Sequence, residues 1–222
     1  MRAWPISLFL LCAVSLSSAP AQGISLWYNG DALGPPDYDM LRGSDHCFYN
    51  DFNVGPSGWN VEEVWGIYAL KPGYPVATAA SWEIRSGMSD GNAGTLVASG
   101  EGPLTRTEIG EDSWHYFLNR MAVPGLSVNL APGSYWLGMT LNYQDITWLA
   151  RTRGTNAIGS PAGNNGNTCE KWFNGYRIVS VDHSMGVGGS EAAEPIPEPT
   201  SVALLGLGFG VLVLGAARGR MT

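Results

Sequence analysis

The sequence predicts an all-β protein. We expect an antiparallel, jelly-roll-like β-sandwich between an N-terminal signal peptide and a single C-terminal transmembrane helix. Roughly eight to ten short runs rich in β-branched and aromatic residues alternate with Gly- and Pro-rich turns, and this spacing is typical of sandwiches and jelly rolls. No stretch of the domain carries a helical period, and no repeat of fixed length indicates a propeller or solenoid.

The first strands are expected among turn-forming residues. Residues 24–28 and 47–49 are brief apolar runs within a segment rich in Gly, Pro, Asp and Asn. Residues 61–70 (VEEVWGIYAL) are dense in β-branched and aromatic side chains, which predicts a strand buried on both faces. Residues 79–85 alternate apolar with polar side chains, as a strand with one face in a core does.

The later strands follow a loop at residues 86–94. They are expected at residues 95–99, 114–121, 126–130, 134–141, 146–151 and, as the last strand, 176–181. The run 153–168 is nearly all Gly, Asn, Ser, Thr and Pro, so a long loop is expected there. Four tryptophans fall within strand patterns and are expected to be buried: Trp65, Trp82, Trp136 and Trp148.

Charge and cysteine content narrow the class of protein. The chain of 222 residues has a formal net charge of −7 and no basic stripe, so no nucleic-acid partner is expected.

Of its three cysteines, Cys12 falls in the signal peptide, which leaves Cys47 and Cys169 as candidates for one disulfide. That bridge would close a loop of about 120 residues. The alternative is two unrelated thiols.

The N-terminus has the three parts of a secretory signal. Arg2 supplies the positive charge, residues 6–16 supply the apolar core, and Ala19-Pro20-Ala21 supplies the cleavage pattern. We therefore expect residues 1–21 to be a signal peptide that directs the chain to the Sec translocon. The mature chain would begin at Gln22.

The C-terminus has three parts in a fixed order. A flexible linker is expected at 187–195, after a domain spanning 22–186. Within the final segment, 196–222, an apolar run at 201–217 is long enough for a helix that crosses a thin bilayer.

This terminal segment resembles a known sorting signal. Pro197, Glu198 and Pro199 precede the helix, while Arg218 and Arg220 follow it and would lie in the cytoplasm. The arrangement resembles the PEP-CTERM signal of exported proteins in Gram-negative bacteria that make extracellular polysaccharide. The resemblance implies that an exosortase-type membrane enzyme processes the chain at the Pro-Glu-Pro motif. It also implies anchoring in the inner membrane before processing, and location at the cell surface or in the extracellular matrix afterwards.

A second resemblance concerns the domain itself. The segments 82–87, 94–100 and 130–137 together resemble a β-sandwich module found in exported PEP-CTERM proteins. The pattern is a strand, a Gly turn, a short strand, and then a turn into a long core strand. It implies a scaffold and no particular activity.

No catalytic signature is found, so no enzyme is expected. The Gly-x-Ser-x-Gly and His-Glu-x-x-His patterns are absent, and His115 is expected to lie in a strand with a structural role. Glu62 and Glu63 are adjacent, so in a strand they would point to opposite faces and could not share a substrate.

No cofactor or metal is expected, although calcium is an open possibility. Asp37, Asp39, Asp45 and Asp51 lie in one loop-rich region, and residues 90–92 offer oxygen ligands in another. The favoured interpretation is that these are solvated turn residues.

Aromatic content is the most informative feature of the domain. Trp59 and Trp172 border turns, where exposed indole rings stack on sugar faces. The alternative is that both tryptophans pack in the core.

These observations lead to a ranked set of functions. The first is an exported, non-enzymatic surface or matrix protein associated with exopolysaccharide. The alternatives are a carbohydrate-binding module and, with less support, an extracellular hydrolase, which would need two carboxylates converging on a cleft.

Overall fold

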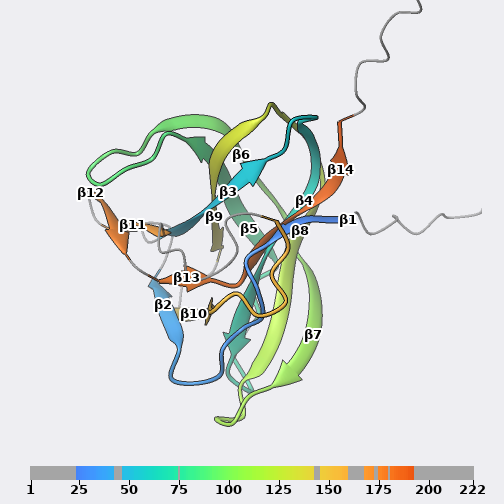
Figure 1. The fold of residues 1–222 in the computed structure, drawn as a ribbon. Helices are drawn as coiled ribbons and strands as arrows, with labels where there is room; N and C mark the ends of the chain where they lie inside the picture. The colour runs from blue at the N-terminus through green and yellow to red at the C-terminus, as the bar shows by residue number, and fades with distance from the viewer. Residues whose placement is uncertain are drawn as a thin grey trace, which may run out of the picture.

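The described part of the chain consists of antiparallel β-sheets. The computed structural model describes residues 24–42, 47–74, 76–142, 146–159, 168–172, 175–179 and 181–192. These residues form fourteen strands and no helix (Figure 1), so the all-β prediction is confirmed. Within the ranges just given, no helix has the length and apolarity to cross a membrane. The signal peptide, the Pro-Glu-Pro motif, the expected membrane helix and its arginines lie outside the described residues.

The strands have the following bounds. In chain order they are β1 (Ile24–Tyr28), β2 (Tyr38–Arg42), β3 (Cys47–Val54), β4 (Trp59–Leu70), β5 (Ala79–Ser86), β6 (Thr95–Pro103), β7 (Thr105–Glu111), β8 (Phe117–Leu130), β9 (Gly133–Leu141), β10 (Ile146–Thr152), β11 (Thr168–Trp172), β12 (Gly175–Val179), β13 (Asp182–His183) and β14 (Met185–Glu191).

The strands form two sheets. In the first sheet, β4 pairs with β8 along one edge, and β8 pairs with β7. Along its other edge, β4 pairs first with β14 and then with β10. β14 pairs in turn with β1, and β10 pairs with β2 and β13. The second sheet has the order β12-β11-β3-β9-β5-β6. From β3 onwards the chain repeatedly crosses between the sheets, at β3 to β4, β4 to β5, β6 to β7, β8 to β9, β9 to β10, β10 to β11 and β12 to β13.

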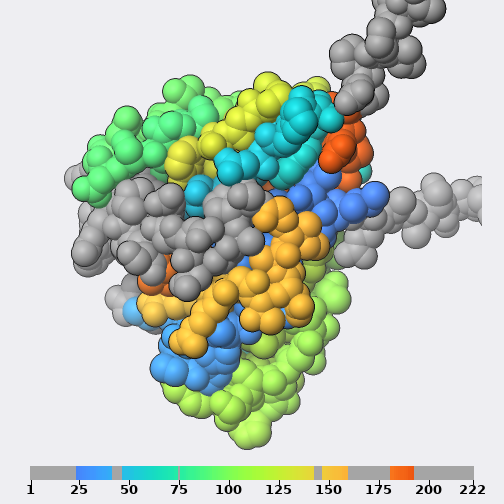
Figure 2. Space-filling view, viewed as in Figure 1, coloured from blue at the N-terminus to red at the C-terminus, as the bar shows by residue number. Residues whose placement is uncertain are grey.

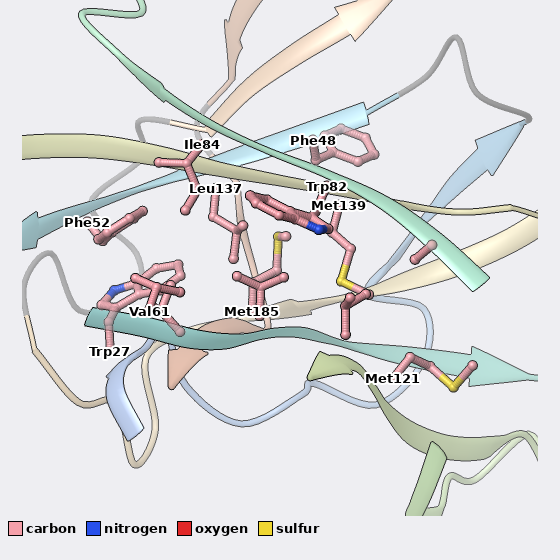
Figure 3. Packing of buried hydrophobic residues seen from close by; sticks show 14 of the residues in the cluster. Trp27, Phe48, Phe52, Val61, Trp82, Ile84, Met121, Leu137, Met139 and Met185 are labelled. Atoms are coloured by element: carbon pink, nitrogen blue, oxygen red, sulfur yellow. The ribbon is translucent and has the colours of Figure 1, made fainter. Parts of the chain in front are cut away.

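One hydrophobic core lies between the two sheets. Met185, Val61 and Met121 of the first sheet face Ile84, Leu137 and Met139 of the second (Figure 3). The aromatic end of this core is a stack in which Phe52 lies 5.2 Å from Trp27 and 5.8 Å from Trp59, measured between ring centroids.

Strand β4 is buried on both faces, as the sequence predicted. Val64 and Tyr68 contact the core, whereas Trp65 and Ile67 form a second apolar cluster on the outer face of the first sheet. Two chain segments, 29–37 and 153–159, lie side by side over part of this outer face (Figure 2). They are joined by backbone hydrogen bonds, including Asp31 N–H to the Thr155 carbonyl at 2.7 Å.

The predicted linker is wrong for residues 187–191. These residues belong to β14, which pairs with both β1 and β4, and Val187 is fully buried. The glycines in and beside this expected linker are required by packing. A Cβ atom at Gly186 would lie 2.2 Å from the ring of Trp65, and Gly189 sits at a β-bulge with φ +150°. The domain therefore continues through Glu191.

Several predicted strands are also corrected. Residues 117–130 form one strand, because Pro124-Gly125 sits at a β-bulge opposite Glu63 and does not end the strand. Residues 114–116 belong to the preceding turn. The strands β2, β7, β11, β13 and β14 were not predicted, and residues 176–181 are not the last strand.

Candidate functional site

An aromatic patch lies at the hairpin that joins β7 to β8. We define the aromatic patch as Trp114, Tyr116 and Trp148. Trp114 is 54% exposed and meets Tyr116 edge-on at 6.2 Å, and Tyr116 stacks on Trp148 of β10 at 5.5 Å. An exposed indole that packs edge-on against a second ring, itself stacked on a third, is a typical ligand platform.

Asp112 organises the turn that presents Trp114. One carboxylate oxygen accepts the backbone N–H of Trp114 at 2.7 Å and that of Tyr116 at 3.0 Å. The other oxygen accepts the hydroxyl of Tyr38 on β2. Burial, together with this hydrogen bond, raises the pKa of Tyr38 above its ordinary value. His115 takes a left-handed conformation, φ 64°, which reverses the chain. His115 is therefore an exposed turn residue, and its predicted place in a strand is wrong.

A groove of about 700 Å³ lies on the outer face of the first sheet. β4, β7 and β8 form it, and the bulge at Pro124-Gly125 makes one wall. Its polar lining includes Asn60, Glu62, Glu63, Thr107, Arg120 and Asn129. We refer to it below as the β4–β8 groove.

A buried ion pair forms the floor of the groove. The guanidinium of Arg120 donates to both carboxylate oxygens of Glu63, at 3.0 and 2.7 Å, and lies over the ring of Trp65 at 4.2 Å. Both Glu62 and Glu63 line the groove. The prediction that they face opposite sides is wrong, because a β-bulge between Val61 and Glu63 shifts the register of β4 there.

A second polar cluster joins β2, β10 and β13, and only its His183 is fully buried. Asp39 accepts hydrogen bonds from the Nε2 atom of His183 at 2.8 Å and from the Arg151 guanidinium at 2.6 and 2.5 Å. Burial acts to raise the pKa of Asp39, but the hydrogen bonds from His183 and Arg151 outweigh it and hold that pKa well below its usual value. Burial also lowers the pKa of His183. The ring of His183 packs against Phe48 at 4.3 Å, so this cluster stabilises the fold from within.

The structure rejects one predicted sugar-stacking residue. Trp59 is only 6% exposed, and its ring is nearly parallel to that of Phe52 inside the core. A sugar cannot reach that ring, so the role predicted for Trp59 is wrong. Trp172 ends β11, and its side chain lies outside the described residues.

The two cysteines of the predicted disulfide lie on adjacent strands but not opposite each other. Cys169 pairs with Tyr49, and Cys47 pairs with Lys171, in the ladder between β3 and β11. The two cysteines are therefore diagonal neighbours on adjacent strands, and the bridge stays a prediction.

In the part of the chain that the structure describes, the acidic side chains considered for calcium are not gathered into one site. Among the described residues, no three His, Cys, Asp or Glu side chains lie close enough together to hold a metal ion. Asp39 is engaged by Arg151 and His183, and Asp45 lies outside the described residues. Asn92 accepts the N–H of Gly94 within its own turn.

Sequence reasoning missed the aromatic patch because it assigned Trp114 to a strand. A signal was present: Asp112-Ser113 is turn chemistry, and an Asp carboxylate readily accepts the N–H two residues further on. Trp148 was expected to be buried, yet it is only partly covered. The contact between Tyr116 of the turn and Trp148 of β10 could not be read from either segment alone.

Comparison with known protein families and with curated proteins finds no match for this chain.

Proposed function

We propose that this chain is an exported, non-enzymatic surface or matrix protein that attaches to extracellular polysaccharide through the aromatic patch. The observation that carries this proposal is the exposed ring of Trp114, which packs against Tyr116 in a turn whose backbone Asp112 holds.

The chemistry of the patch suits a sugar ring. The C–H face of a pyranose is apolar and packs on an aromatic ring, while its hydroxyls need hydrogen-bonding groups at the rim. Ser113 and Glu111 lie beside Trp114 in the same exposed hairpin and supply such groups. The proposal thereby moves the sugar platform from Trp59 to Trp114.

The export route rests on the two ends of the sequence. A signal peptide at 1–21 would pass the chain to the Sec translocon, and the segment 196–222 would be anchored and then processed at Pro197-Glu198-Pro199 by an exosortase-type enzyme. We assign the domain to the jelly-roll-like sandwiches. Its repeated crossing between two antiparallel sheets supports that assignment.

A hydrolytic activity has less support. Glycoside hydrolysis needs one carboxylic acid that can give up a proton and a second carboxylate across the cleft. In the β4–β8 groove, both carboxylate oxygens of Glu63 are engaged in a bidentate pair with Arg120. Glu62 is its immediate neighbour in the chain, and the two do not face each other across a cleft.

Binding is tested on the full chain, purified in mild detergent. Affinity electrophoresis through gels containing neutral exopolysaccharide should show retardation of the natural protein. The W114A variant should bind about tenfold more weakly, because it loses a stacking ring. Tyr74→Ala is the matched control, since Tyr74 is also an exposed aromatic residue but lies outside the patch. Equal binding by W114A and the natural protein would refute the role of the patch.

Export is tested separately by cell fractionation and by mass measurement of the mature chain. The expected product begins at Gln22 and lacks the residues beyond Pro199. A cytoplasmic protein with an intact N-terminus would refute export. An intact Arg218-containing end on an exported chain would refute processing alone.

A further inference from the structure

The aromatic patch and the β4–β8 groove lie on the same face of the first sheet. Side chains alternate along β8, so Leu118 and Arg120 face outward while Asn119 and Met121 face inward. Tyr116 of the patch lies in the turn just before β8 and stacks on Trp148, whereas Arg120 belongs to the groove. From Phe117, the first residue of β8, to the groove wall at Pro124, the strand rises about 23 Å. A single elongated ligand lying along β8 would therefore contact both.

The groove offers polar groups that the protein itself does not use. Thr105, Thr107, Ser127 and Asn129 are exposed and line it. Within the described ranges, none of these four side chains forms a hydrogen bond with another residue. Hydroxyl and amide groups both donate and accept, which matches the paired donor and acceptor character of sugar hydroxyls.

The charges in the groove favour an uncharged ligand. Glu63 already neutralises Arg120, so the exposed carboxylate of Glu62 leaves the groove with a net negative charge. The whole chain is also acidic, with a net charge of −7. An anionic polymer such as a uronic-acid chain would be repelled on approach.

We propose that the β4–β8 groove and the aromatic patch are two ends of one elongated site for an uncharged polysaccharide chain. The patch binds one sugar by stacking, and the groove binds sugars further along the same chain through their hydroxyls. This inference rests on the proposed function, since it takes the patch to be a sugar platform. It adds a minimum ligand length and the exclusion of acidic polymers.

The test compares ligand lengths by isothermal titration of the full chain. The probes are a disaccharide and a hexasaccharide from the cello-, laminari- and chito-oligosaccharide series, together with an alginate hexasaccharide as the anionic probe. In the series that binds, the hexasaccharide should bind at least about tenfold more tightly than the disaccharide, because about two additional hydrogen bonds form. The alginate probe should bind more weakly than the neutral hexasaccharide.

A double variant isolates the contribution of the groove. T105V/T107V removes two hydroxyls from the groove and keeps the β-branched shape suited to a strand. It should lose the gain shown by the hexasaccharide and leave disaccharide affinity unchanged. Thr95→Val is the control, because Thr95 is an exposed threonine on β6 of the other sheet. W114A should weaken both lengths.

The outcomes separate the two proposals. Equal affinity for the disaccharide and the hexasaccharide, or an undiminished length effect in T105V/T107V, overturns the elongated site and leaves the patch standing. Tighter binding of alginate than of the neutral hexasaccharide overturns the ligand class. If no neutral sugar of either length binds, and neutral exopolysaccharide does not retard the protein, the proposed function fails together with this inference.

Discussion

Breaking the buried ion pair under the β4–β8 groove should cost much of the stability of the domain. The Arg120 and Glu63 side chains are 16% and 11% exposed, and two charge-assisted hydrogen bonds join them. Arg120→Met keeps most of the side-chain volume but leaves the Glu63 carboxylate buried without a counter-ion. Removing one partner of a buried pair costs about 3–5 kcal/mol. Because both side chains retain some contact with water, we expect about 3 kcal/mol.

The structure also predicts how the two charges depend on each other. Glu63→Gln/Arg120→Met removes both charges together, so no unpaired ion remains and the expected loss falls to about 1 kcal/mol. The double variant should therefore be more stable than Arg120→Met alone. Part of its remaining deficit is the lost contact between Arg120 and the Trp65 ring, worth at least about 0.5 kcal/mol.

Urea denaturation, followed by tryptophan fluorescence, measures these differences. For a domain of this size, 3 kcal/mol corresponds to a fall of about 6–12 °C in Tm. Glu108→Gln is the matched control: its carboxylate lies 3.6 Å from Arg106 and is 53% exposed, so its loss should cost under about 1 kcal/mol. The reasoning is refuted if Arg120→Met costs no more than the control, or if the double variant is less stable than Arg120→Met.

Three further predictions follow from other parts of the fold. Because the pKa of His183 is lowered by burial in the folded chain, only the unfolded chain takes up this proton as pH falls below about 6.5. The free energy of unfolding should therefore fall by up to about 1.4 kcal/mol per pH unit. His183→Gln should abolish this slope in denaturation curves and His115→Gln should keep it, whereas a slope retained by His183→Gln would contradict the assignment. Gly186→Ala should cost about 1–3 kcal/mol or more, since its Cβ would lie 2.2 Å from an indole ring, and an unchanged Tm would show that this ring can move aside. If Cys47 and Cys169 are bridged, iodoacetamide should label neither until the protein is reduced, and reduction should cost about 4–5 kcal/mol; labelling of the unreduced, denatured chain would exclude the bridge.

The sequence was most informative where local pattern and burial coincide. Residues 61–70 have no polar face except at the two glutamates, and the corresponding strand β4 is central and buried on both sides. Residues 79–85 alternate strictly, and Trp82 and Ile84 of that segment face the core. In both cases, the side chains that decide the structure lie within the strand itself.

The sequence was least informative where a distant residue decides the structure. The glycines of 186–189 resemble a linker until the ring of Trp65 is placed against them. Trp59 borders a turn, but Phe52 and the rest of the core cover it. The aromatic patch depends on β10 lying beside the β7–β8 hairpin, and that is a matter of topology.

The pairing of β4 places Glu191 and the Trp114 hairpin at opposite ends of the domain. Trp59, at one end of β4, pairs with Glu191, and Leu70, at the other end, pairs with Phe117 beside the Trp114 hairpin. These ends are about 36 Å apart along the strand. β1 begins at the same end of the domain as Glu191, since Ile24 pairs with Gly189 (Figure 1). An attachment beyond Glu191 would hold the domain at this end of β4. Trp114 would then lie at the opposite end, away from the anchoring surface.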